Sequence, residues 1–306
     1  MTTDTAIKTV VLTGPSRGLG RATTLAIARD GHRLVLIGRP SSGFDSIRRE
    51  ALDAGAAEVV MLEADLQSVA SIRSAGAEIA ARVERGALPA IDAFIGSAGM
   101  RSANGRTATA DGLEATFAVN VLANVILVDA LLPALAPAAH IVLVGSVLHR
   151  GAFPFTLVNP APVWTAPHDL AQPNGADSDA AGARAYATSK LAVNYLVHEL
   201  QRQVPDGVRV NVYAPGLVVG TGIVRELSPF KVFVWEKVMP AVRFPLMTDE
   251  PTSTDLLAAF ALGESHPEAR AQYVELDKAI AASKASSDPQ REAELIVACR
   301  AIAGSL

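Results

Sequence analysis

The chain reads TVVLTGPSRGLG from Thr9 to Gly20. Its apolar start is typical of a buried strand, and the alanine-rich stretch after it has the spacing of a helix. Glycine lets the backbone turn sharply and approach a bound phosphate, while a helix that begins there offers free N–H groups. The order strand, glycine turn, helix is therefore typical of a dinucleotide site. The spacing differs from Gly-x-Gly-x-x-Gly, so three glycines that only make a tight turn stay an alternative.

Outward from this turn, short apolar runs alternate with helical patterns. The runs lie at 9–12, 33–37, 58–62, 92–95 and 140–144, and the helical patterns at 18–31, 44–55, 68–86 and 111–136. Strand–helix–strand repeats predict parallel strands joined by right-handed crossovers, hence a doubly wound α/β sheet in three α/β/α layers. Further on, the pattern predicts helices at 183–203, 252–261 and 289–303 and strands at 208–214 and 272–276.

Composition bounds the class of protein. The 306 residues are half hydrophobic, which is enough for one large domain over residues 1–306. The net charge of -4, without a basic cluster, argues against nucleic acid or an anionic membrane as partner. The single cysteine, Cys299, favours a reducing cytoplasm. No charge-free apolar run reaches the roughly 18 residues of a membrane span.

The end of the second strand reads Ile37-Gly38-Arg39-Pro40. An acidic residue there would bind the ribose 2′-hydroxyl of NAD, and here Arg39 takes its place, with Arg17 inside the glycine turn. Two guanidinium groups can bind a 2′-phosphate, so we expect NADP(H). Two solvated surface arginines are the alternative. Asp65 can bind the adenine amino group or cap the helix that begins near Ser68.

A second group of residues predicts acid–base chemistry. Tyr186 and Lys190 are four positions apart on a predicted helix and face one side. A nearby ammonium lowers the pKa of a phenol from about 10, which lets the tyrosine protonate a carbonyl oxygen. Ser146 ends the fifth strand, at the edge where open α/β sheets bind ligands. Asn120 lies in an apolar helical stretch, where a polar side chain must have hydrogen-bond partners. It could hold a water that connects Lys190 to solvent, or it could bond backbone groups.

Together these residues resemble the short-chain dehydrogenase/reductase family along nearly the whole chain. The resemblance implies a Rossmann fold with a catalytic triad of Ser146, Tyr186 and Lys190, and a tetrad that includes Asn120. Lys190 would also bind the nicotinamide ribose. The expected cofactor-binding residues are Gly14, Ser16, Arg17, Gly18, Leu19, Gly20, Arg39, Asp65, Leu66, Ser97, Ala98, Gly99, Tyr186, Lys190, Pro215, Gly216, Leu217, Val218 and Thr221, with no metal ligand.

The segment after Pro215-Gly216 and the final helix are similar to the retinol-dehydrogenase and protochlorophyllide-reductase-like branch. Ser97-Ala98-Gly99 stands where the family has Asn-Ala-Gly, and we expect a local effect with cofactor binding retained. Gly145 replaces the first serine of the usual pair. Protochlorophyllide reductases have active-site cysteines, whereas Cys299 lies in the last predicted helix.

Tyr186 comes 40 positions after Ser146, a much longer separation than the family resemblance implies. The insert at 148–182, with His149, Phe153, Phe155 and Trp164, and a lid at 224–251 are expected to face the substrate. Their aromatic side chains favour a bulky hydrophobic substrate, and a small satellite core under the loop is the alternative. His149 and His168 lack metal-ligand spacing.

We therefore expect an NADPH-dependent reductase of a ketone or aldehyde on a polyketide-, terpenoid- or steroid-like molecule. The first alternative is an enzyme that reduces a carbon–carbon double bond. The second alternative is a non-catalytic regulatory protein that binds NADP(H). The family resemblance implies a homodimer or homotetramer, and the C-terminal extension leaves a monomer as the alternative.

Overall fold

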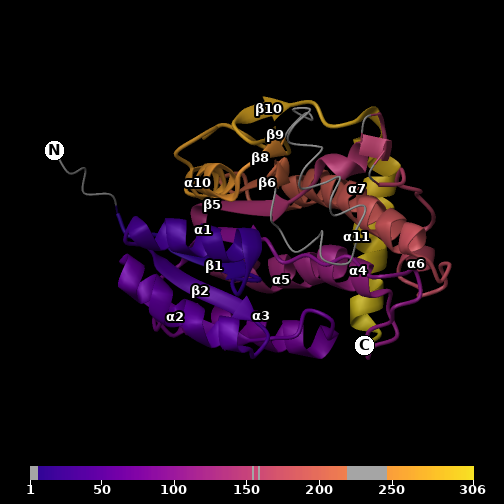
Figure 1. The fold of residues 1–306 in the computed structure, drawn as a ribbon. Helices are drawn as coiled ribbons and strands as arrows, with labels where there is room; N and C mark the ends of the chain where they lie inside the picture. Colours follow the sequence, from indigo (N-terminus) through magenta and orange to yellow (C-terminus); the bar gives the residue numbers. More distant parts are fainter. Residues whose placement is uncertain (1–5, 154, 158, 219–246) are drawn as a thin grey trace.

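Figure 1 shows the computed structural model, which describes residues 6–153, 155–157, 159–218 and 247–306. One eight-stranded sheet has the order β10-β9-β6-β5-β4-β1-β2-β3. Its strands are β1 (Thr9–Thr13), β2 (Arg33–Gly38), β3 (Glu58–Glu63), β4 (Ile91–Gly96), β5 (Leu135–Val144), β6 (Arg209–Ala214), β9 (Tyr273–Glu275) and β10 (Lys278–Ile280). All neighbours pair in parallel except β9 and β10, which are antiparallel. The predicted doubly wound sheet is confirmed.

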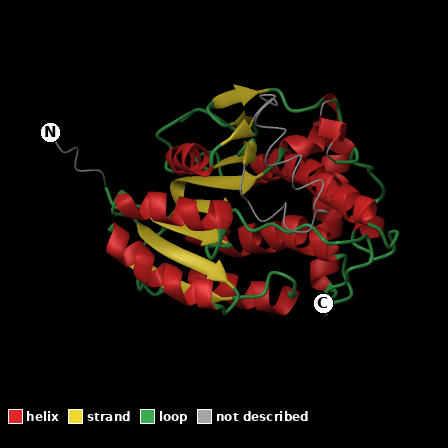
Figure 2. Cartoon of the chain, viewed as in Figure 1, coloured by secondary structure: helices red, strands yellow, loops and turns green. Residues whose placement is uncertain are grey.

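Helices cover both faces of the sheet, so the molecule has three layers (Figure 2). The helices are α1 (Gly18–Arg29), α2 (Ser42–Ala54), α3 (Val69–Glu84), α4 (Ala115–Phe117), α5 (Ala123–Leu131), α6 (Pro167–Leu170), α7 (Asp179–Gln203), α10 (Glu250–Ala261) and α11 (Pro289–Gly304). Alternate residues of β1 face opposite layers: Val10 and Leu12 pack with α1, α2 and α10, whereas Val11 packs in the core that contains α3, α5 and α7.

The strand order reverses between β1 and β4, which are neighbours in the sheet. The β1–α1 turn and the Ser97–Gly99 segment after β4 therefore meet at the carboxyl edge of the sheet. Ligands of open α/β sheets bind in the crevice at such a switch point. The fold thus brings together the predicted cofactor segments at one edge.

The stretch from Ala115 to Ala134 is one apolar helical run, with a π-helical segment at Ala118–Leu122 between α4 and α5. Its length and composition would suffice to cross a membrane, but 83% of it is buried inside the molecule. It is a core helix packed on the sheet and on α3. The prediction of a helix at 111–136 was too long at both ends, because the helical run begins at Ala115 and β5 begins at Leu135.

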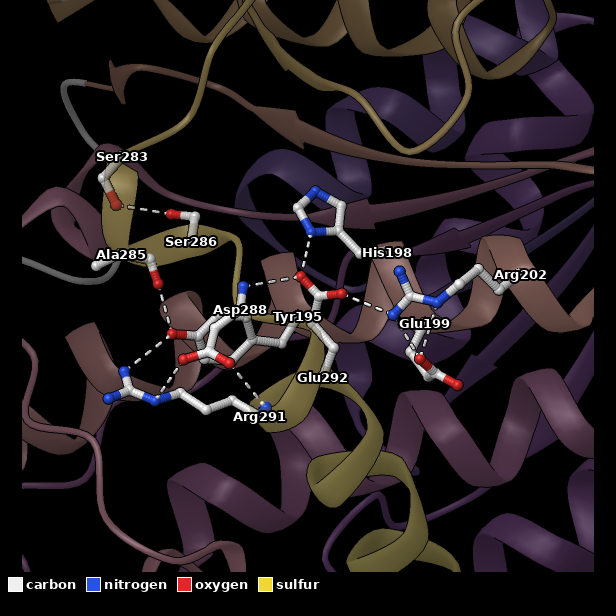
Figure 3. Close-up of polar contacts among 10 residues, drawn as sticks. All are labelled: Tyr195, His198, Glu199, Arg202, Ser283, Ala285, Ser286, Asp288, Arg291 and Glu292. Carbon is white, nitrogen blue, oxygen red and sulfur yellow. Dashed lines mark hydrogen bonds and ion pairs between the residues drawn. The ribbon is translucent and has the colours of Figure 1, made fainter.

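The C-terminal helix α11 lies against α7 through an apolar seam and a polar network, shown in Figure 3. Leu295, Ile296 and Cys299 of α11 are buried in the same core as α5 and α7. In the network, Glu292 accepts hydrogen bonds from His198 at 2.8 Å and from Arg202 at 2.6 Å. The predicted C-terminal extension is therefore an integral part of the helical layer.

The predicted insert 148–182 has more local order than its sequence suggests. It contains 3-10 turns at Val147–Arg150 and Phe155–Leu157, the short helix α6, and the first turn of α7. A two-stranded sheet outside the main one pairs β7 (Leu217–Val218) with β8 (Met247–Thr248) in parallel. Much of the predicted lid at 224–251 lies outside the described residues.

Candidate active site

The glycine turn between β1 and α1 has the shape that the sequence predicts. Gly14 and Gly18 have positive φ angles of 72° and 51°. A Cβ on Gly20 would lie 2.1 Å from the Gly14 carbonyl oxygen, so only glycine fits there. A Cβ on Gly18 would meet nothing within 4 Å, so the outer side of this turn is open.

The first turn of α1 suits an anion. Its N-cap residue Arg17 makes no side-chain capping bond, and the turn contains no acidic residue. The backbone N–H groups of this first turn thus lack the side-chain acceptor that an N-cap residue commonly supplies. This cradle fits a pyrophosphate group.

The two arginines predicted to bind a 2′-phosphate are exposed beside this turn. Arg39 follows β2 directly, and both arginines are exposed residues. The start of α2 lies against the turn, since a Cβ on Gly43 would be 3.0 Å from the Ser16 carbonyl oxygen. The backbone N–H of Gly14 donates to the Ile37 carbonyl at 3.0 Å. The chain therefore holds the segments that carry Arg17 and Arg39 side by side.

The ends of β3 and β4 carry the next predicted residues. Ser97 donates its hydroxyl to the Thr13 carbonyl oxygen, and the Ala98 N–H donates to the Thr13 hydroxyl at 3.0 Å. Serine thus ties β4 to the end of β1, as expected of a short side chain that replaces asparagine. The Asp65 carboxylate accepts from the Gln67 N–H at 3.0 Å, and Ser68 caps α3. The capping role proposed for Asp65 was wrong, because Ser68 has it; Leu66 beside it is buried.

Asn120 lies in the π-helical segment, and its side chain spans two elements. Its Oδ1 accepts from the Met100 N–H and its Nδ2 donates to the Met100 carbonyl, each at 2.9 Å. Nδ2 also donates to Ser189 of α7 at 2.9 Å. Of the two roles considered, satisfying backbone groups is the one the geometry shows. π-Bulges are frequent at functional sites, and this one presents Asn120 toward α7.

Tyr186 is buried on α7, and the Ser146 hydroxyl lies near enough to act on its phenol. Burial raises the pKa of the phenol to about 12, although the Ser146 hydrogen bond and the Arg101 charge act to lower it. The expectation that Lys190 would lower the pKa of Tyr186 is wrong for the chain by itself, because desolvation outweighs the neighbouring groups. Ser146 also accepts the Leu148 N–H at 3.3 Å, which fixes its hydroxyl at the end of β5.

Lys190 lies one turn further along α7, with its ammonium nitrogen 5.6 Å from the centre of the Tyr186 ring. That nitrogen donates to the Val144 carbonyl at 2.8 Å, and burial lowers its pKa to about 8. A Cβ on Gly99 would lie 3.6 Å from both Lys190 Nζ and Asn120 Oδ1. The structure therefore brings Asn120, Tyr186 and Lys190 together beside the end of β4.

The segment after β6 carries the last of the predicted cofactor-binding residues. Pro215 accepts from the Ser253 hydroxyl at 3.2 Å, and Gly216 has a positive φ of 73°. The backbone of Leu217–Val218 forms β7, whereas Thr221 lies outside the described residues.

The aromatic residues of the insert differ in their burial and in their contacts. His149 is buried beside Ser146, with its Nδ1 at 2.6 Å from the Ser146 carbonyl oxygen, and burial lowers its pKa to about 4. Trp164 packs edge-on against Tyr195 of α7, with ring centroids 4.7 Å apart, and so belongs to the main core rather than to a separate satellite core. Phe153 is exposed and Phe155 is buried. His168 is exposed on α6.

One residue at the site was missed by sequence reasoning. Arg101 follows the turn after β4, its side chain is only 7% exposed, and its charge acts on Tyr186. An isolated arginine in a loop has no periodicity and no motif, so only the fold reveals its place.

Comparisons with known proteins show the family of the chain. A family model described as short chain dehydrogenase matches residues 8–158 and 174–231. A Streptomyces protein provisionally named daunorubicin C-13 ketoreductase is 33% identical over 249 residues, covering 76% of this chain and 79% of its own. Human retinol dehydrogenase 13 is 33% identical, covering 69% of this chain and 59% of its own length.

The fold is also similar to solved structures. A blue fluorescent protein from a metagenomic library, in complex with NADPH, has a TM-score of 0.63 at 22% identity, covering 88% of this chain and 96% of that one. At this identity the likeness concerns the fold alone. On the family model and the curated relatives, the chain belongs to the short-chain dehydrogenase/reductase family, in the branch that contains retinol dehydrogenases.

Proposed function

We propose that this oxidoreductase uses NADPH to reduce a ketone or aldehyde on a bulky hydrophobic molecule. The observation that carries the proposal is the meeting of Ser146, Tyr186 and Lys190 at the carboxyl edge of the sheet, next to the glycine turn. A relative that bears a ketoreductase name supports the same class of reaction.

Each residue would have a distinct task. Bound NADPH supplies the hydride. The phenol of Tyr186, protonated at neutral pH because its pKa is raised to about 12, would donate its proton to the substrate oxygen. The Ser146 hydroxyl would hold that oxygen beside the phenol. Lys190 would bind the ribose and stabilise the phenolate that proton donation leaves. Asn120 would hold the 99–101 backbone in place.

Tyr186→Phe tests the acid role. The variant should lose nearly all NADPH-dependent ketone reduction while binding NADPH as before. Tyr195→Phe is the matched control: it makes the same change on α7, where the Tyr195 hydroxyl donates to the Ala285 carbonyl instead. Unchanged turnover in Tyr186→Phe would overturn the mechanism. A product that gains two hydrogens but keeps its carbonyl would assign double-bond reduction instead.

The preference for NADPH rests on Arg39 and Arg17, which replace the acid that would favour NAD. Arg39→Asp should raise the KM for NADPH about tenfold or more and spare NADH, because a charged 2′-phosphate contact is lost. Arg49→Asp is the control, because it makes the same change of charge at an exposed position within α2, ten residues further along the chain. Equal effects of Arg39→Asp on both cofactors would refute the 2′-phosphate role.

The expected hydrophobic substrate and the cytoplasmic location are also proposals. The position of His149 beside Ser146, at the start of the insert, supports a substrate wall formed by the insert. The single cysteine, Cys299, is a free buried thiol, which suits a reducing compartment.

A further inference from the structure

Ser146 lies just beyond the part of β5 that the sheet holds in place. The pairing of β5 with β6 ends at Val144 and Tyr213, and the Gly145 N–H donates to the Tyr213 carbonyl at 2.8 Å. A serine that holds a substrate oxygen needs a fixed backbone, because a displacement of about 1 Å at a reacting group can cost about a hundredfold in rate. The residues after Gly145 must therefore supply the contacts that fix Ser146.

His149 supplies a contact at the carbonyl of that serine. The 3-10 turn Val147–Arg150 brings His149 back to Ser146, and its Nδ1 lies 2.6 Å from the Ser146 carbonyl oxygen. The His149 backbone N–H donates to the same oxygen at 3.3 Å. The His149 side chain is fully buried and packs beside the Tyr273 ring of β9, with centroids 4.9 Å apart. The core therefore holds the imidazole against the serine.

The two partners of the ring define one tautomer. A carbonyl oxygen only accepts hydrogen bonds, so Nδ1 of His149 must carry the proton that it shares with Ser146. On the other side, the Ser283 backbone N–H donates to Nε2 at 3.4 Å, so Nε2 must be unprotonated. Burial lowers the pKa of His149 to about 4, which agrees with a neutral ring at pH 7. The ring thus has one donor and one acceptor, and both are in use.

Ser283 belongs to a segment that is also bonded to α7. The 3-10 turn Lys284–Ser286 follows it directly, and the Tyr195 hydroxyl of α7 donates to the Ala285 carbonyl within this turn (Figure 3). Tyr195 is on the same helix as Tyr186. The imidazole therefore connects the end of β5 to a segment that is tied to the helix of the proposed acid.

Resting on the proposed reductase function, we propose that His149 is a positioning residue that holds Ser146 in place for the reaction. Its Nδ1–H fixes the Ser146 carbonyl, and its Nε2 fixes the ring against the segment that begins at Ser283. Because the His149 side chain is fully buried, it acts through the serine. Loss of the Nδ1 donor should therefore lower kcat and leave the KM for NADPH unchanged.

Two substitutions separate the two contacts of the ring. The side-chain amide of Asn can place a donor where Nδ1 lies, whereas the longer Gln side chain reaches the position of Nε2 and leaves the Ser146 carbonyl without its ring donor. With 2-naphthaldehyde and NADPH, His149→Gln should lower kcat about tenfold or more, and His149→Asn by less than about threefold. Thermal unfolding and NADPH binding verify that both variants fold.

His198→Gln is the matched control further along α7. It removes the same kind of contact, since Nδ1 of His198 bonds Glu292 at 2.8 Å, and it should change kcat by less than about twofold. The tautomer is measured without turnover. In protein labelled with ¹⁵N-histidine, long-range ¹H–¹⁵N spectra at pH 7 should show His149 protonated on Nδ1, with its signals identified by their loss in His149→Asn.

The outcomes separate the inference from the reductase function. Equal losses of kcat in His149→Asn and His149→Gln, or no loss in either, would overturn the positioning role while the reductase stands. A proton on Nε2 of His149 would overturn it as well. No reduction of 2-naphthaldehyde by the unaltered protein would count against the reductase function and the inference together.

Discussion

At the scale of single residues, Tyr186 and Lys190 show how burial sets the resting state of the site. Desolvation disfavours both charged forms, so the pKa of the phenol rises to about 12 and that of the ammonium falls to about 8. Without a partner charge, the pair therefore tends toward a neutral phenol and a weakly held lysine proton. Activation of the tyrosine then depends on what binds beside it.

The buried lysine should cost stability at neutral pH. A lysine titrates near 10.5 in the unfolded chain and near 8 in the folded one, so between these values the unfolded state binds more protons. Folded stability therefore rises with pH through this window and is lowest below it. Lys190→Met should unfold at a higher temperature than the unaltered protein at pH 7, with loss of activity.

Thermal unfolding from pH 7 to 10 measures this effect. The advantage of Lys190→Met should shrink as the pH rises above 8. Lys278→Met, at an exposed position of the edge strand β10, is the control with no expected trend. A difference in unfolding temperature between Lys190→Met and the unaltered protein that stays the same at every pH would contradict a lowered pKa of Lys190.

At the scale of elements, the helices and strands with a regular hydrophobic pattern could be predicted from the sequence, and those without such a pattern could not. The apolar runs placed β1 to β4 almost residue by residue, because strands covered on both faces must be apolar throughout. The first half of β5 escaped notice, since Pro137 within it argues against a strand. The Tyr186–Lys190 pair was visible from its spacing.

Other features of the site depend on contacts between distant segments, which spacing alone cannot show. The π-helical segment around Asn120 breaks no sequence pattern. Arg101 becomes meaningful only when Asp179, 78 positions away, lies against it. The Glu292 network likewise joins α11 to α7, so no spacing within one helix predicts it.

We predict that replacing Gly182 by alanine destabilises the protein, although alanine has the higher helix propensity. Glycine to alanine within a helix usually stabilises by about 0.5–1 kcal/mol. In Gly182→Ala the new Cβ would meet the Ser102 carbonyl oxygen at 2.1 Å and the Asn104 N–H nitrogen at 2.9 Å, both backbone atoms. The variant should lose about 1–3 kcal/mol of unfolding free energy, because the loop must move away from α7.

Urea denaturation of Gly182→Ala and Gly304→Ala tests the prediction. Gly304 ends α11, and a Cβ there would meet nothing within 4 Å, so that variant should be neutral or slightly stabilised. Equal stability of the two variants would show that the loop accommodates the methyl group without cost.

At the scale of the whole molecule, α11 closes the helical layer that α5 and α7 would otherwise expose. Its buried residues Leu295, Ile296 and Ile302 share one core with those helices. Among the described residues, large exposed hydrophobic side chains come from separate elements, such as Leu52 of α2 and Val297 of α11. Scattered apolar residues do not by themselves form an interface.

Because α11 already covers α5 and α7, we expect a monomer. Light scattering coupled to gel filtration should give a mass near 31.9 kDa across a range of protein concentrations. A mass of about twice that value would mean that another surface pairs two copies, as the family resemblance alone implies.

The α7–α11 interface should also govern acid unfolding of the whole protein. The Glu292 side chain is 2% exposed and is bonded by His198 and Arg202 (Figure 3). Burial opposes its ionisation, but the hydrogen bonds from Arg202 and His198 together outweigh burial and place its pKa below the usual 4.5. A lowered carboxyl pKa contributes stability above the unfolded value, and this contribution is lost as the pH falls through the folded one.

Glu292→Gln should therefore be less stable than the unaltered protein at pH 7 by about 1–3 kcal/mol, the cost of weakening buried charge-assisted bonds. The difference should narrow as the pH falls below 4.5, because the unaltered carboxylate then takes up a proton and loses its advantage. Glu294→Gln, two residues along on the exposed side of α11, should follow the unaltered protein throughout. Urea unfolding at several pH values measures all three proteins. If Glu292→Gln and the unaltered protein lose stability in parallel toward acid, then Glu292 is not the carboxylate that joins the C-terminal helix to the rest of the fold.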